Sequence, residues 1–208
     1  MSSVLDKVRK TALYLSVEDF FQRFDDAWSK ATDRLFKLET LQEYQEEEAS
    51  GLSEFSVGNM HGFVEKARLW RQEEKEAYED IRSRGIVFMR LRIARFPLSA
   101  YTRFEYYIYH ISEQMGEDIR FIDEASASNI SLPDLFIFDS KVLLLYDYGP
   151  SASLLGGYVV TDPSLIGEIA EEIMSLFSRS RPFKEMMSPD PSLVRDLIRA
   201  EPGGSAEA

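Results

Sequence analysis

Charged side chains that stand among apolar residues are the part of this sequence best suited to chemistry. Arg90 and Arg92 interrupt a hydrophobic run, and Arg103 and Glu105 interrupt an aromatic-rich one. A buried arginine normally needs a carboxylate, most often as a bidentate pair. The structural interpretation is therefore an ion-pair network that joins the two segments. The functional interpretation is a pocket that binds an anion or another small ligand.

Three further polar residues extend this candidate ligand-binding set. Asp118 and Asp139 stand at the edges of predicted strands, and Tyr146 ends an apolar run. Arginines and carboxylates that converge on one concave site bind small molecules or, in an enzyme, transfer protons. The complete candidate set is Arg90, Arg92, Arg103, Glu105, Asp118, Asp139 and Tyr146.

The sequence lacks the motifs of the common catalytic classes. It has no cysteine, only two histidines, and neither a glycine-rich phosphate loop nor a G-x-S-x-G or H-E-x-x-H pattern. Pro133-Asp134 and Asp139-Ser140-Lys141 superficially resemble a nuclease motif, but the metal-binding carboxylates of such motifs normally lie further apart in sequence. We expect no catalytic residue set, no metal site and no cofactor. This favours a protein that is not an enzyme, although catalysis stays open.

The charge balance bears on the partners of the protein. The 36 acidic residues exceed the 24 basic ones, which gives a net charge of −12. A general nucleic-acid binder needs a dominant basic surface, so we expect no direct nucleic-acid binding and a better match to a basic partner. Part of the excess lies in residues 39–48, which form either a solvated segment or an acidic docking patch. No apolar run approaches membrane-spanning length and no secretory leader pattern is present, so we expect a cytoplasmic protein without membrane association.

Hydrophobic periodicity predicts the elements that position these residues. Helices are predicted over 3–15, 17–31, 60–84, 99–114, 163–177 and 191–200. Strands are predicted over 34–38, 86–93, 118–122, 135–138, 142–146 and 154–160, and loops over 51–59 and 123–131. The alternation of residues 86–93 places Arg90 and Arg92 on the face opposite Met89 and Leu91.

This pattern is typical of an α+β fold. We expect one domain at residues 16–184, with a mixed, largely antiparallel sheet of about five or six strands flanked by helices. A helical extension at 1–15 precedes it, and a short helix and a disordered tail follow in 185–208. The two flanking helices form a candidate contact for a homo-oligomer.

Sequence blocks along most of the chain resemble one known family. They are F-K-L-E at 36–39 with Tyr44, P-L-S-A-Y-T-R-F-E at 97–105, G-E-D-I-R at 116–120, L-P-D at 132–134, and F-I-F-D at 136–139 with Val142 and Tyr146-Asp147. In this order, over roughly residues 20–183, they resemble the actinobacterial domain of unknown function six-eight-seven-nine (DUF6879). The resemblance implies no established activity. Members are often encoded beside XRE-type helix-turn-helix regulators, which implies a role in a regulatory pair.

The chain departs from the family pattern at two positions. Ser140 stands where the family usually has a second Asp, and Leu145 stands where it often has His. The loss of that His weakens a catalytic interpretation further. The segment around Phe138-Asp139 is also similar to the second half of a degenerate phospholipase D-like sensor domain, which is an analogy of fold alone.

Two functional hypotheses follow. The first is a non-catalytic regulatory protein that binds a protein partner, such as a helix-turn-helix regulator. The alternative is a small-molecule or anion sensor, or a carboxylate-based enzyme, with an arginine-lined pocket. Convergence of the candidate residues on one solvent-reachable pocket would favour the alternative, and arginines already paired in the interior would count against it.

Overall fold

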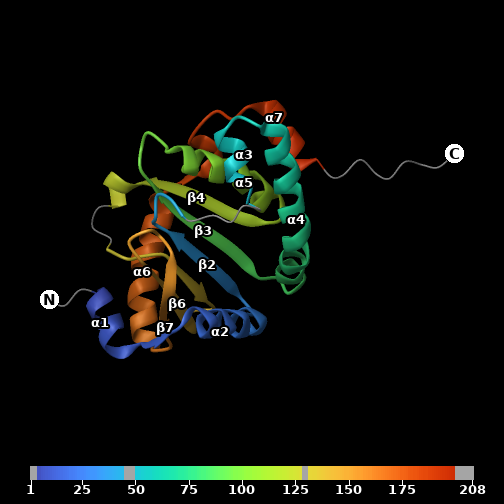
Figure 1. The fold of residues 1–208 in the computed structure, drawn as a ribbon. Coiled ribbons are helices and arrows are strands. Elements are labelled where there is room, and N and C mark those ends of the chain that lie inside the picture. Colours follow the sequence, from blue (N-terminus) through green and yellow to red (C-terminus); the bar gives the residue numbers. More distant parts are fainter. Residues whose placement is uncertain (1–3, 45–49, 128–130, 200–208) are drawn as a thin grey trace.

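Strands and amphipathic helices build a sheet that is covered by helices on both faces (Figure 1). The computed structural model describes residues 4–44, 50–127 and 131–199. The predicted disordered tail at 201–208 and part of the acidic segment 39–48 lie outside these ranges. The elements are α1 (Val4–Thr11), β1 (Leu13–Leu15), α2 (Val17–Lys30), β2 (Arg34–Glu39), α3 (Leu52–Ser56), α4 (Met60–Ser83), β3 (Val87–Ala94), α5 (Ala100–Gln114), β4 (Glu117–Asp123), η2 (Glu124–Ala127), β5 (Leu135–Phe138), β6 (Val142–Tyr148), β7 (Leu154–Val160), α6 (Pro163–Arg179), β8 (Arg181–Pro182), η3 (Phe183–Glu185) and α7 (Pro191–Ile198).

The described strands form one sheet in the order β1-β7-β6-β5-β2-β3-β4-β8. The strands β2, β3 and β4 run parallel, and each of the other neighbouring pairs is antiparallel. Helices α4 and α5 make the long connections that parallel neighbours require. The predicted α+β class with a mixed, largely antiparallel sheet is therefore confirmed.

The predicted strand number is wrong, because the sheet has eight strands instead of five or six. All six predicted strands are present, and β1 and β8 add the two edges. These edge strands have three and two residues, which is too short for a period-two pattern to be detected.

The N-terminal helix is shorter than predicted. The spacing predicts one helix over 3–15, but α1 ends at Thr11 and Leu13–Leu15 pair with β7. Two glycines of β7 make room for this strand and for α2. A Cβ on Gly156 would collide with the backbone of Leu15, and a Cβ on Gly157 would collide with the ring of Phe20. The Gly-Gly pair therefore marks a close approach of backbone and side chain.

Other differences concern short local structure. Leu52–Ser56, inside the predicted loop 51–59, form the helix α3, and Glu124–Ala127, inside the predicted loop 123–131, form a 3-10 turn. Ser16 and Asp162 are the N-caps of α2 and α6, since their side chains accept hydrogen bonds from the backbone of the first helical turn. Ser99 caps α5 in the same way.

The two faces of the sheet carry different helices (Figure 1). Helices α1 and α6 cover one face through an apolar core. On the other face, α2 packs over β5, β6 and β7, and α4 and α5 pack over β3 and β4. Helix α7 packs on α4 and α5 through Leu193 and Leu197. Between α2 and α5 the sheet presents polar side chains, and the candidate site lies there.

Candidate functional site

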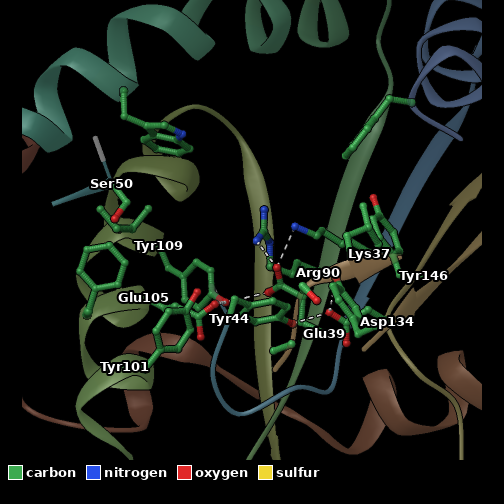
Figure 2. Close-up of a pocket in the computed structure, with 18 residues that line it drawn as sticks. Lys37, Glu39, Tyr44, Ser50, Arg90, Tyr101, Glu105, Tyr109, Asp134 and Tyr146 are labelled. Atoms are coloured by element: carbon green, nitrogen blue, oxygen red, sulfur yellow. Dashed lines mark hydrogen bonds and ion pairs between the residues drawn. The ribbon is translucent and has the colours of Figure 1, made fainter. Parts of the chain in front are cut away.

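A cavity of about 510 Å³ opens on the sheet face between α2 and α5 (Figure 2). Strands β2, β3 and β6 supply its floor, and α5 supplies most of one wall. Figure 2 places Glu105 and Tyr109 on one side of the cavity and Lys37, Asp134 and Tyr146 on the other. The lining residues are Phe21, Lys37, Glu39, Tyr44, Ser50, Trp70, Arg90, Tyr101, Phe104, Glu105, Ile108, Tyr109, Asp134, Tyr146, Tyr148, Ala152, Ser153 and Leu154.

Local periodicity explains why these side chains meet. In the parallel pair of β2 and β3, Lys37 lies opposite Arg90 and Glu39 lies opposite Arg92. Alternation along each strand sends these four side chains to the same face. On α5, Glu105 and Tyr109 are four residues apart and therefore share the helix face that looks toward the strands.

Arg90 is the centre of a buried ion-pair network. Its Nε and Nη2 donate to the two carboxylate oxygens of Glu117, at 2.5 and 3.1 Å, and its Nη1 donates to Glu39 Oε1 at 2.8 Å. Lys37 Nζ lies 2.8 Å from the same Glu39 oxygen. The Tyr78 hydroxyl donates to Glu117 Oε2 at 2.9 Å. These bonds fix the Arg90 guanidinium in the floor of the cavity.

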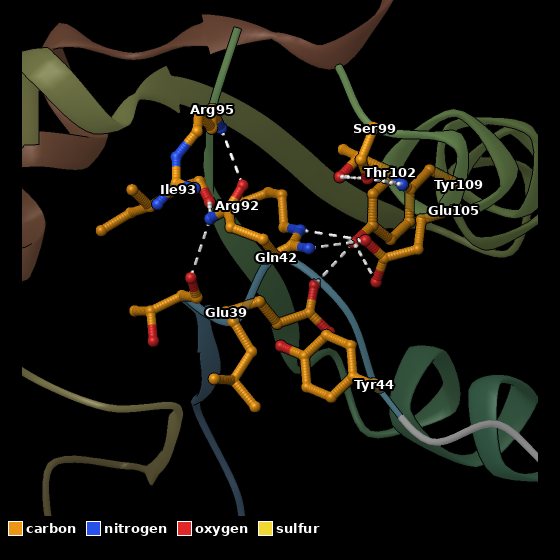
Figure 3. A network of polar contacts seen from close by, with 12 residues as sticks. Glu39, Gln42, Tyr44, Arg92, Ile93, Arg95, Ser99, Thr102, Glu105 and Tyr109 are labelled. Carbon is orange, nitrogen blue, oxygen red and sulfur yellow. Dashed lines mark hydrogen bonds and ion pairs between the residues drawn. The ribbon is translucent and has the colours of Figure 1, made fainter. Parts of the chain in front are cut away.

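Arg92 joins β3 to α5 (Figure 3). This side chain is fully buried, and its Nε and Nη2 donate to Glu105 Oε2 at 3.1 and 2.8 Å. Its Nη1 has no hydrogen-bond partner among the described residues, and the guanidinium carbon lies 5.7 Å from the centre of the Tyr44 ring. The ion-pair network predicted between the segments 86–93 and 99–114 is confirmed.

One tyrosine bridges the two halves of this network. The Tyr109 hydroxyl donates to Glu39 Oε2 at 2.7 Å, and it lies 3.3 Å from Glu105 Oε1. Its ring also lies under the Arg90 guanidinium, whose carbon is 5.2 Å from the ring centre. Glu39 and Glu105 therefore share a single hydroxyl proton.

The two carboxyl groups respond differently to burial. Burial alone would raise the pKa of Glu39, but the charges of Arg90, Lys37 and Arg92 hold that pKa far below its ordinary value. Burial raises the pKa of Glu105 to about 7, with the negative charge of Glu39 adding to the effect and Arg92 opposing it. Glu39 is therefore ionised at neutral pH, and Glu105 titrates there.

Asp134 organises the rim beside Tyr44. Its Oδ1 accepts from the backbone N–H of Thr40 at 2.7 Å and of Leu41 at 3.2 Å. Its Oδ2 accepts from the hydroxyls of Tyr44 and Tyr148. Five bonds, with that of the Thr40 hydroxyl included, occupy this carboxylate, so its role is to hold the loop after β2 and two tyrosines in place.

The candidate residues named from the sequence divide into two groups. Arg90, Glu105 and Tyr146 line the cavity, and Arg92 lies directly behind Glu105. The structure does not bring Arg103, Asp118 and Asp139 to this cavity. Arg103 is exposed on α5, and exposed Asp118 pairs with Arg120 on β4. Asp139 lies in the β5–β6 turn and accepts from the backbone N–H groups of residues 32–34.

Sequence reasoning did not name several residues of the site. Lys37, Glu39, Glu117 and Asp134 occur in the blocks that resemble the family, but neither these blocks, nor the acidic segment that holds Glu39, nor the nuclease-like pattern that holds Asp134 identifies them as site residues, and Tyr109 is not singled out. The alternation of β2 was the available signal for Lys37 and Glu39. Nothing local identifies Glu117, because its bond to Arg90 depends on the register of β3 and β4.

A nuclease arrangement is not formed. Asp134 immediately precedes β5 and Asp139 immediately follows it, so their carboxylates lie at opposite ends of one strand. Among the described residues, no group of three or more Asp, Glu or His side chains is placed to hold a metal ion. The described part of the chain also contains no helix with the length and hydrophobicity needed to cross a membrane.

Comparisons with known proteins identify a family but no function. The model of a family described as "Domain of unknown function (DUF6879)" matches residues 22–188. No curated protein matches the chain. Among solved structures, the chain is similar to TrmBL2, an archaeal chromatin protein described as showing a novel mode of DNA binding, with 10% sequence identity and a TM-score of 0.41. The similarity covers 82% of this chain and 54% of that one, so the chain spans about half of that protein, and a likeness at this level carries no argument.

Proposed function

The chain belongs to the DUF6879 family, and from this premise we propose that it is a cytoplasmic regulatory protein whose cavity binds a small molecule. The observation that carries the proposal is the cavity of about 510 Å³, lined by buried charged side chains and five tyrosines. Ligand sites typically have volumes of about 300–1,000 Å³ and combine aromatic walls with a few fixed polar groups.

The arginines are already paired in the interior, which counts against the arginine-lined anion pocket considered from the sequence and leaves a cavity for another class of ligand. Arg90 already donates to two carboxylates, and Arg92, whose Nη1 has no hydrogen-bond partner among the described residues, lies behind Glu105 and does not line the cavity, so neither serves as a free anion receptor there. Their ion pairs instead hold Glu39 and Glu105 in fixed positions beside the cavity. A binding site needs such preorganised first contacts, supported by a second layer of residues.

We further propose that the protein acts with a basic helix-turn-helix regulator. The net charge of −12 suits a basic partner, and a regulatory pairing is what the family resemblance implies. Phe21 could contact a ligand and such a partner at the same time, because its side chain lines the cavity and is 46% exposed at the surface. Val17, one turn earlier on α2, and Leu155 on β7 are also exposed apolar side chains.

A thermal-shift screen of metabolites and nucleotides tests the cavity, because a ligand of the native state raises the melting temperature. Two variants of the same loop give the matched comparison. Ser153→Tyr fills the cavity that Ser153 lines, and Ser151→Tyr adds the same volume at an exposed position outside the lining. We expect compounds that stabilise the wild type and Ser151→Tyr but not Ser153→Tyr.

The outcomes separate binding from catalysis. A bound compound that mass spectrometry recovers unchanged supports a sensor, and a converted compound would make the protein an enzyme. A screen in which no compound depends on Ser153 would contradict the proposal. The partner is tested separately by titration at low salt with any helix-turn-helix regulator that a neighbouring gene encodes, and absence of binding there counts against the pairing.

A further inference from the structure

The cavity wall carries more negative than positive side chains. Among the described lining residues, the cations are Lys37 and Arg90, and the carboxylates are Glu39, Glu105 and Asp134. Both cations bind the same oxygen, Glu39 Oε1, so their charge gathers at one end of the carboxylate cluster. When Arg92, which pairs with Glu105 from behind, and Glu117, which pairs with Arg90, are counted as well, the carboxylates still exceed the cations by four to three.

The hydrogen bonds of Glu105 leave one of its oxygens short of a donor on the α5 side of the cavity. The residue is 7% exposed and lines the cavity. Arg92 makes both of its bonds to Oε2. Among the described residues, Oε1 receives only the Tyr109 hydroxyl at 3.3 Å, and the single proton of that hydroxyl already serves Glu39 at 2.7 Å. A nearly buried carboxylate oxygen on the cavity wall therefore lacks a donor of its own, which is costly in a site of low dielectric.

Aromatic rings line both sides of the same cavity. Tyr44 and Tyr101 lie with their ring centres 5.6 Å apart, and Tyr146 and Tyr148 stack with centres 6.0 Å apart. The faces of such rings attract cations, most strongly where water is excluded. The same protein already uses this contact internally, between Arg90 and Tyr109.

We infer that the ligand is a small organic cation, with a protonated amine or amidine that donates to Glu105 Oε1 beside Glu39 and lies against the tyrosine rings. The inference rests on the proposed function, since it names the ligand class of the same cavity. An ammonium or amidinium group supplies the missing donor and a positive charge that offsets the excess carboxylate, whereas a carboxylate or phosphate would supply neither.

Binding of a cation should release protons from the protein. The charged groups that face Glu105 are Arg92 and Arg90 of β3 and Glu39 of β2, with Tyr44 and Tyr109 beside them. With the pKa of Glu105 at about 7, this carboxyl is about half protonated at pH 7 in the empty protein. A nearby cation favours the ionised form, so binding releases up to about half a proton per molecule at pH 7. An anionic ligand would cause proton uptake instead.

Three probes that share one ring separate the ligand classes: tyramine, neutral 4-ethylphenol and anionic 3-(4-hydroxyphenyl)propionate. They are titrated calorimetrically into the full chain, in two buffers of different ionisation enthalpy, alongside equal numbers of cationic, neutral and anionic metabolites. We expect tyramine and other cations to bind best and to release protons. Glu105→Gln should lower the affinity for cations by about tenfold or more, because the charged donor of the ligand loses its anionic acceptor. Glu124→Gln, in an exposed pair with Arg95 outside the cavity, is the control.

Each outcome decides between the two claims. Cations that bind with proton release, and that Glu105→Gln weakens, support the inference. Cavity binders that are neutral or anionic would overturn it and leave the proposed function intact. If no member of any charge class depends on Ser153, the proposed function fails and the inference fails with it. The proton count uses the wild-type protein, so it stays decisive even if Glu105→Gln does not fold.

Discussion

Replacing Glu105 with Gln isolates the proton that this buried carboxyl holds at neutral pH. Burial raises the pKa of Glu105 from its ordinary 4.5 to about 7, with Glu39 adding to the effect and Arg92 opposing it. Between these two pKa values the folded protein keeps a proton that the unfolded chain has released. The folded state binds more protons, so the free energy of unfolding falls as the pH rises through this window. Gln keeps the shape of the protonated acid and does not titrate.

The magnitude follows from the two pKa values. A tenfold difference in proton affinity is worth about 1.4 kcal/mol, so the full effect at Glu105 is about 3 kcal/mol. At pH 5 most of this destabilisation is absent, and the free energy of unfolding of Glu105→Gln should match that of the wild type within about 1 kcal/mol. At pH 8 the variant should be the more stable protein by about 2–3 kcal/mol.

Urea unfolding at pH 5, 6, 7 and 8 measures this difference. Glu124→Gln is the matched control. The pKa of exposed Glu124 is lowered by its hydrogen bond to Arg95, so the difference in free energy of unfolding between this variant and the wild type should stay constant over this pH range. A Glu105→Gln variant that loses stability relative to the wild type as the pH rises would refute the reasoning. Glu105 would then be an ordinary ionised partner of Arg92, with a low pKa.

Further predictions concern the framework around the site. Asp139→Ala removes an acceptor for three backbone N–H groups, and it should lower the free energy of unfolding by about 2–4 kcal/mol at pH 7. Because the folded pKa of Asp139 lies well below its ordinary 3.8, this deficit should shrink in denaturation at pH 3, and a constant deficit would disprove the role of its charge. Gly157→Ala should lose about 1–3 kcal/mol in thermal unfolding through collision with Phe20, whereas Gly167→Ala, in open space on α6, should be neutral or stabilising. Leu197→Ala should cost about 2–5 kcal/mol, and no loss would mean that α7 does not pack on α4 and α5 as described.

The sequence predicted the elements whose periodicity is long. Helices α4 and α5 and the six longer strands follow from repeats of 3.6 and 2 residues. The same alternation correctly places Arg90 and Arg92 on one face. Their pairing with carboxylates follows from the requirement of a buried arginine for a negatively charged partner. The edge strands β1 and β8 have too few residues to form a repeat, and Leu13–Leu15 become a strand only because β7 accepts them as a neighbour.

The site was predicted only in part, because it depends on register. Glu39 lies opposite Arg92 and Glu117 lies near Arg90 only when β2, β3 and β4 align in parallel as they do. Asp139 was a reasonable candidate as an acid at a strand end, but its turn folds back onto residues 32–34 and uses the carboxylate for backbone hydrogen bonds. Arg103 is a candidate because it interrupts the same aromatic-rich segment as Glu105, yet two positions along a helix place side chains on different faces.

The fluorescence of Trp70 tests the ligand-binding account most directly. The chain has two tryptophans: Trp70 lines the cavity, and Trp28, on α2, packs against Phe24, Phe88 and Phe136. A Trp28→Phe variant reports from the cavity alone, and a Trp70→Phe variant reports from the α2 core. The account predicts that a compound which raises the melting temperature changes the Trp70 signal saturably and leaves the Trp28 signal unchanged. A stabilising compound that leaves Trp70 unchanged at saturation, or that alters Trp28 alone, would contradict it.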